Sequence, residues 1–160
     1  MSDPQWVTPT VQCNPVYVFD RLMPILQRDV DEFNGLTVEE RHGYHVKLDQ
    51  VETSMRSSIR LRRYDTDEVD DENGSTPRIL FIRTERGISV ELYNVVHPNC
   101  PGNRLLAHPA WNPIQRCHVS INNDHHLALW EFSRHVLLPF FFPHLRDSPS
   151  PMIVKKLQGA

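Results

Sequence analysis

The chain has 160 residues and a net charge of −3, and 39% of its residues are hydrophobic, 9% aromatic and 23% charged. This length and composition allow one domain with a sizeable core and exclude a globally disordered chain. The acidic balance also excludes a uniformly basic protein that coats nucleic acid.

Residues 1–13 contain Pro4 and Pro9 and are expected to form an irregular arm. They show neither the basic segment nor the apolar segment of a secretory signal peptide. The longest apolar stretch, residues 136–142, is far shorter than the roughly 20 residues that cross a bilayer. We therefore expect a soluble, cytoplasmic protein with no membrane partner.

A helix is predicted after Asn14-Pro15, because Asn is a favoured N-cap and Pro is favoured at the first helical position. An apolar stripe follows at spacings of three and four. It consists of Phe19, Leu22, Leu26, Val30 and Phe33. Gly35 is a suitable stop for this helix, and Pro24 is expected to kink it or to mark its real start.

The middle of the chain predicts strands. Residues 44–63 fit both an alternating and a helical pattern, and we predict two strands because Ser57-Ser58 interrupts the helical spacing. Residues 78–96 are clearer, since an apolar run and an alternating run flank a turn that ends at Gly87. That arrangement is typical of a β-hairpin.

A second hairpin is predicted in residues 117–130, where Asn122-Asn123-Asp124 turns the chain. From about Glu131 the spacing becomes helical again. The order of elements therefore indicates an α+β fold. We expect an N-terminal helix, a meandering antiparallel sheet of about six strands and a C-terminal helix packed on one face.

Three segments lack such a pattern. Residues 65–72 hold six acidic side chains and are expected to form a solvated loop. Residues 97–116 contain four prolines and are read as a long loop, a kind of segment that is often functional. Residues 146–160 are expected to be a flexible tail, which leaves residues 14–145 as a single domain.

The alternation of the strands predicts a working surface. If the apolar strand residues point into the core, their neighbours share the face that the helices leave open. We predict partner contacts for eight residues, namely Arg60, Arg62, Glu91, Tyr93, His118, Ser120, His126 and Trp130. Leu80 and Ile82 would add an apolar patch, and aromatic and arginine side chains are enriched in protein interfaces.

The histidines and cysteines offer a metal alternative. His97 and Cys100 form a His-x-x-Cys step that looks like half of a zinc knuckle. His118 and His126 would have to complete a zinc site. Zinc in this set is the one cofactor that we consider, and the leading expectation is that the protein has none.

The cysteines do not predict a disulfide framework. Cys13, Cys100 and Cys117 are odd in number and widely spaced. Cys117 alternates with polar residues in its predicted strand and is expected to be buried as a free thiol.

The motifs of several enzyme classes are missing, since the chain has no G-x-S-x-G, no Walker A and no G-x-G-x-x-G sequence. We therefore expect a small intracellular adaptor that binds a protein partner, or a second copy of itself, through the open sheet face and the 97–116 loop. One alternative is a metal-dependent hydrolase or zinc-stabilised domain. The other is single-stranded nucleic-acid binding, which the acidic charge disfavours.

Overall fold

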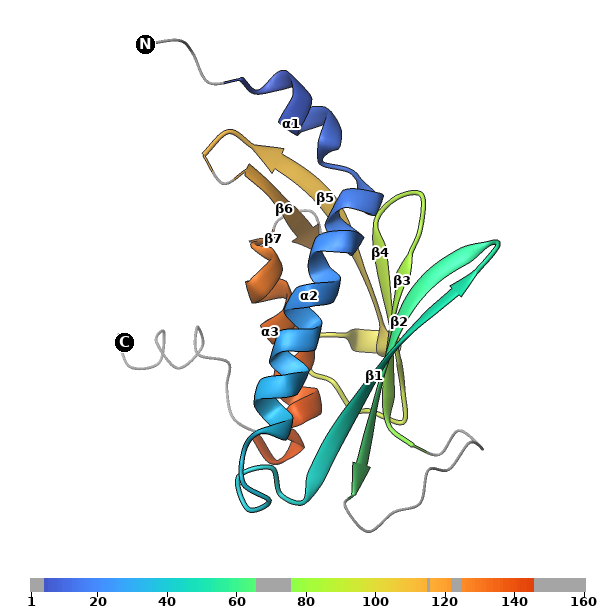
Figure 1. Ribbon diagram of the computed structural model, residues 1–160, viewed down its shortest axis with the longest axis vertical. Coiled ribbons are helices and arrows are strands. Elements are labelled where there is room, and N and C mark those ends of the chain that lie inside the picture. The colour runs from blue at the N-terminus through green and yellow to red at the C-terminus, as the bar shows by residue number, and fades with distance from the viewer. Residues whose placement is uncertain (1–4, 66–75, 115, 122–124, 146–160) are drawn as a thin grey trace.

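The computed structural model describes residues 5–65, 76–114, 116–121 and 125–145. It shows a curled antiparallel sheet with two long helices side by side on one of its faces (Figure 1). The α+β fold predicted from the sequence is therefore confirmed. The turn at residues 122–124, the acidic run beyond Asp65 and the tail at residues 146–160 lie outside the described residues.

The sheet is a seven-stranded meander in which each strand pairs with the next one along the chain. The strands are β1 (Tyr44–Thr53), β2 (Arg56–Asp65), β3 (Arg78–Arg83), β4 (Ile88–Tyr93), β5 (Arg104–Asn112), β6 (Arg116–Ile121) and β7 (His125–Leu127). The two strands predicted in residues 44–63 are thus confirmed. Both predicted hairpins are present as β3–β4 and β6–β7.

The 97–116 segment corrects the prediction of a long loop. It contains a short 3-10 helix, Pro101–Asn103, followed by β5, which pairs with both β4 and β6. Pro109 has no N–H to give to a ladder, and the neighbouring prolines and asparagines conceal the alternation of Leu105 and Ala107. The structure places these two side chains in the core.

Close packing of β4 against β5 explains why glycine ends the turn of the β3–β4 hairpin. Gly87 ends the turn, and a Cβ atom there would overlap with the carbonyl of Ala107 in β5. A residue without a side chain is therefore required where the two strands meet.

Helix α2 (Pro15–Asn34) begins and packs as its sequence predicts. The side chain of Asn14 accepts a hydrogen bond from the N–H of Tyr17 at 3.0 Å, and the apolar stripe from Phe19 to Phe33 is buried. Pro24 neither starts nor interrupts the helix. Its side chain is exposed, so the proline ring meets solvent rather than the core.

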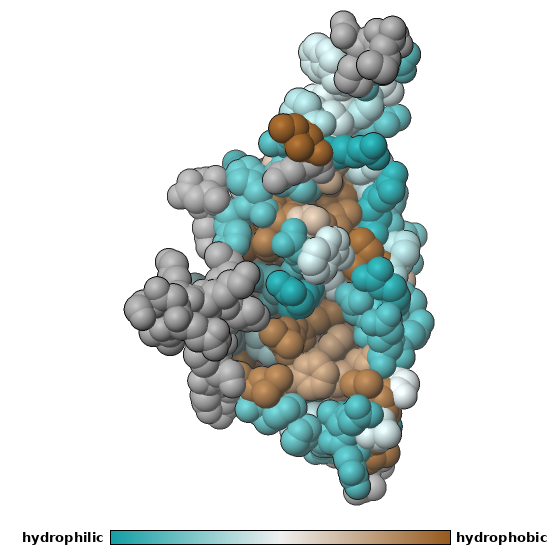
Figure 2. All heavy atoms as spheres, turned by 90° about the vertical axis from the view of Figure 1, so that its left-hand side faces the viewer, coloured by the Kyte–Doolittle hydropathy of each residue, from teal (hydrophilic) through white to brown (hydrophobic). Residues whose placement is uncertain are grey.

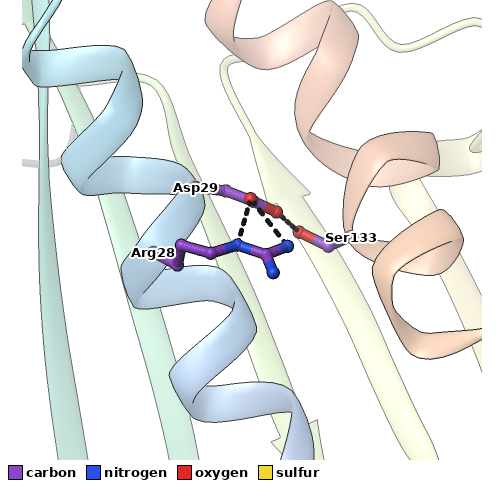
Figure 3. A network of polar contacts seen from close by, with 3 residues as sticks. All are labelled: Arg28, Asp29 and Ser133. Carbon is purple, nitrogen blue, oxygen red and sulfur yellow. Dashed lines mark hydrogen bonds and ion pairs between the residues drawn. The ribbon is translucent and has the colours of Figure 1, made fainter.

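Helix α3 (Leu129–Phe141) packs beside α2 and completes the core. The two helices are also joined by a polar contact, in which Ser133 donates to a carboxylate oxygen of Asp29 at 2.6 Å (Figure 3). Arg28 pairs with the other oxygen of Asp29 at 3.3 Å. Among the described residues, no helix is both long and apolar enough to span a membrane.

The N-terminal segment corrects two predictions. Residues Val7–Gln12 form a short helix, α1, which extends beyond the end of the sheet (Figure 1). Cys13 then forms a disulfide with Cys117 of β6, with the two Cα atoms 5.5 Å apart. The wide spacing of 104 residues concealed this bond, because only the fold brings α1 to β6.

Candidate interaction face

Cross-strand pairing places seven of the eight predicted partner-binding residues on the face opposite the helices. Directly paired residues share a face, and one row runs from Asp49 through Arg60, Leu80 and Glu91 to Arg104. A second row joins Lys47, Arg62, Arg78 and Tyr93. A third row, on β5 to β7, joins His108, Ser120 and His126. We call the first two rows the arginine face.

Cations outnumber carboxylates on the arginine face. Its five cations are Lys47, Arg60, Arg62, Arg78 and Arg104, and its two carboxylates are Asp49 and Glu91. Asp49 accepts from Arg62 at 2.8 Å and from Arg60 at 3.3 Å through one oxygen. Glu91 pairs with Arg104 at 3.4 Å. Both carboxylates are thus already engaged, and the excess charge of the face is positive.

Tyr93 is fixed by its neighbours on this face. Its hydroxyl donates to Glu91 at 2.8 Å, and this hydrogen bond raises the pKa of the phenol. The guanidinium of Arg78 lies 4.7 Å from the ring centroid, within the range of a cation–π contact. An oriented aromatic ring beside an arginine is a common centre of a protein interface.

The arginine side chains of this face are partly buried near their Nε atoms. Among the described residues, the Nε atoms of Arg60 and Arg78 are buried and have no hydrogen-bond partner. The terminal amino groups are consequently the parts of these guanidinium groups that an incoming acceptor can reach. Their stems cover apolar area, as long cationic side chains commonly do.

The predicted apolar patch is smaller than expected. Leu80 and Ile82 do lie on the open face, and Leu106 joins them through its pairing with Ser89. However, Ile82 is 5% exposed and contributes little accessible surface. Half-buried Leu80 and Leu106 remain as the apolar centre.

Trp130 does not share this face. It lies in the first turn of α3, not in β7, and it is 52% exposed. Arg134 of the same helix lies over its ring. Trp130 lines a hollow of about 350 Å³ between α2 and α3, where hydrophobic side chains gather within a hydrophilic rim (Figure 2). The sequence pattern assigned Trp130 to the strand because two residues are too few to distinguish the alternation of a strand from the spacing of a helix.

The four residues predicted for zinc do not come together. No group of three or more His, Cys, Asp or Glu side chains suited to a metal ion occurs in the part of the chain that the structure describes. His97 uses both ring nitrogens internally, since Nε2 donates to the carbonyl of Val136 at 2.7 Å and Nδ1 accepts from the N–H of Asn99. Burial raises the pKa of the Cys100 thiol to about 11, so it is not a thiolate at neutral pH.

His97 and Cys100 instead attach the segment after β4 to helix α3. His97 and Cys100 are buried, and Asn99 donates to the carbonyl of His135 at 3.2 Å. These contacts place the first part of the 97–116 segment on the helix side, away from the arginine face. Only its β5 part contributes to that face.

The other two histidines of the zinc prediction are in contact. His118 Nε2 and His126 Nδ1 are 2.8 Å apart, and His118 Nδ1 lies 3.1 Å from the carbonyl of Arg116. His118 is buried and His126 is exposed. Ser120 lies directly opposite His126 in the ladder.

Sequence reasoning missed four residues of the arginine face, namely Lys47, Asp49, Arg78 and Arg104, and it missed Leu106 in the next row on the same side of the sheet. Lys47 and Asp49 lie in β1, and the alternation of that strand could have assigned them to the open face. It could not have shown which residues of β2 they pair with. Arg104 and Leu106 belong to the strand that was predicted as a loop. Strand register, which depends on distant pairing, was the missing information.

No family model, curated protein or solved structure matches this chain. A fold alone does not define a function, so the function is inferred from the chemistry of the arginine face and its surroundings.

Proposed function

We propose that the protein is an interaction module whose arginine face binds an acidic segment of a partner protein. The observation that carries this proposal is the excess of guanidinium groups around a small apolar centre, on a sheet face that none of the described helices covers (Figure 1). Arginine pairs with carboxylates through two parallel hydrogen bonds, which gives both energy and orientation.

The partner chemistry follows from the charges on the face. Asp49 and Glu91 already accept hydrogen bonds from arginines or from Tyr93, so a cationic partner finds no unengaged carboxylate there. An acidic segment can reach the amino groups of Arg60 and Arg78 and place an apolar side chain on Leu80 and Leu106. Complementary charge of this kind increases association rates and selects the partner.

The proposal is tested by fluorescence polarisation with a labelled peptide of alternating Glu and Leu residues. The variant Arg60→Ala/Arg78→Ala/Tyr93→Ala removes two cations and the aromatic ring, and we expect its affinity to fall about tenfold or more, since such residues often dominate interface energies. Asp49 keeps Arg62 as a partner in this variant. Circular dichroism checks that the fold is retained.

The matched control is Arg28→Ala/Arg134→Ala/Trp130→Ala, which likewise removes two arginines and one aromatic residue, but from the helix side. Its affinity should stay within about twofold of wild type, because its sites lie on the opposite layer. Equal losses in both variants, or no binding of the acidic peptide to wild type, would overturn the proposal.

Two other experimental results would show that the arginine face binds a different partner. Tighter binding of a single-stranded oligothymidine than of the peptide, lost in the same triple variant, would assign the face to nucleic acid. A wild-type dimer in sedimentation velocity that the triple variant abolishes would assign it to a second copy of the chain.

A further inference from the structure

Three pairs of histidines lie with their rings close together, and their geometries differ. The ring centroids are 3.7 Å apart for His42 and His144, 6.2 Å for His125 and His135, and 4.9 Å for His118 and His126. In the last pair a nitrogen of each ring faces the other at 2.8 Å. This convergence of nitrogen atoms is the feature that a metal ion requires.

The tautomer of His118 is set by its backbone partner. A carbonyl oxygen can only accept, so the contact of His118 Nδ1 with the carbonyl of Arg116 requires the proton on Nδ1. The neutral ring therefore carries its lone pair on Nε2, which faces His126. The proton shared by the pair belongs to Nδ1 of His126. A backbone carbonyl behind one nitrogen is the usual support of a metal-binding histidine.

The other two pairs lack this arrangement. His42 and His144 are nearly stacked, with ring planes 33° apart, and nitrogen lone pairs lie in the ring planes rather than between stacked faces. His135 is half-buried near His97, and its backbone carbonyl accepts a hydrogen bond from Asn99. Among the described residues, neither pair forms a hydrogen bond between ring nitrogens.

We propose that His118 and His126 form a two-histidine site for a divalent transition-metal ion such as Zn²⁺. His118 would bind through Nε2 and His126 through Nδ1, after the proton of His126 has moved to Nε2, so both rings remain neutral. Zinc binds imidazole nitrogens at about 2.0–2.1 Å, and the exposed ring of His126 has room to move outward by the small amount needed. Water completes the coordination.

The site selects the metal by its ligands. Imidazole suits Zn²⁺, Ni²⁺ and Cu²⁺, whereas Mg²⁺ and Ca²⁺ prefer oxygen ligands. Since no third His, Cys, Asp or Glu of the described residues joins the pair, the ion keeps open positions. The site is therefore weaker than a four-ligand structural zinc site, and folding does not depend on it.

The test is isothermal titration of the full chain with zinc chloride, with magnesium chloride as the comparison. We expect one zinc ion per chain for wild type, no heat from magnesium, and at least a tenfold loss of zinc affinity in His126→Ala. His125→Ala changes the neighbouring histidine on the other face of β7 and should bind zinc as wild type does. His126 is exposed, so its variant is expected to keep the fold.

A second readout does not depend on any variant. Long-range proton–nitrogen spectra of the imidazoles should show His118 with its proton on Nδ1, and zinc should shift His118 Nε2 and His126 Nδ1. Zinc binding unchanged in His126→Ala, or shifts confined to His42 and His144, would overturn the proposal, as would the absence of zinc binding. Neither readout involves the arginine face. Failure of the zinc proposal would therefore leave the proposed binding of an acidic partner segment unaffected.

Discussion

Two histidines, His135 within helix α3 and His97 beside it, are held in the neutral form by their surroundings. Burial lowers the pKa of His97, and burial with smaller contributions from His97, His125 and Arg134 lowers the pKa of His135 to about 4. An unfolded histidine has its ordinary pKa near 6.5. Between about pH 6.5 and 4 the unfolded chain therefore binds more protons at His135 than the folded chain does, and the lowered pKa of His97 acts in the same direction.

This difference predicts a pH dependence of stability. The free energy of unfolding should fall as the pH falls through that window, because protons then favour the unfolded state. For His135 the contribution is at most on the order of 3 kcal/mol, given about 1.4 kcal/mol for each unit of pKa shift. Urea unfolding at pH 7, 6, 5 and 4.5 measures it.

The variant His135→Gln supplies the control for this pH dependence. It removes one titrating ring, so its free energy of unfolding should vary less with pH than that of wild type. An identical slope in the two proteins would show that His135 does not titrate as proposed.

At the scale of the elements, one side chain joins the end of α2 to the first strand. Asn34, the last residue of α2, donates to the carbonyl of Val46 at 2.8 Å and accepts from the N–H of Val46 at 3.0 Å. Its amide thus pairs with β1 as a neighbouring strand would. This contact sets the position of the helix layer against the edge of the sheet.

Replacing this amide should destabilise the fold in graded steps. Asn34→Ala removes both hydrogen bonds and should cost about 1–3 kcal/mol, because it leaves the partly buried groups of Val46 without partners. Asn34→Asp keeps the acceptor and loses the donor, so its cost should be smaller. Urea unfolding at pH 7 ranks the variants, and equal stability of all three proteins would contradict this role.

At the scale of the whole molecule, the disulfide between Cys13 and Cys117 joins the N-terminal segment to β6. It closes a loop that contains α2 and most of the sheet. A cross-link over a loop of this length restricts the unfolded chain strongly, and disulfides typically contribute about 2–4 kcal/mol.

Removing the disulfide should lower the free energy of unfolding by about that amount. The comparison is urea unfolding of wild type with and without dithiothreitol, and of Cys13→Ser/Cys117→Ser, which should no longer respond to reductant. Denatured, unreduced wild type should show one reactive thiol, from Cys100. Three reactive thiols would contradict the bond.

Local patterns in the sequence determined much of this protein. The apolar stripe of α2, the two strands predicted in residues 44–63 and the alternation around Val90 predicted the layers and the pairing of neighbouring strands. Alternation also placed Arg60, Glu91 and Tyr93 on one face, because successive strand residues point to opposite sides whatever the rest of the chain does.

Only the tertiary structure decided the contacts between distant parts of the chain. Four features join segments that no local pattern connects. They are the pairing of β5 with β4, the disulfide, the position of Trp130 on the helix side and the hydrogen bond of His97 to the carbonyl of Val136. The physical reason is that alternation reports the side to which a residue points, whereas its partner depends on strand register and on how the layers close around the core.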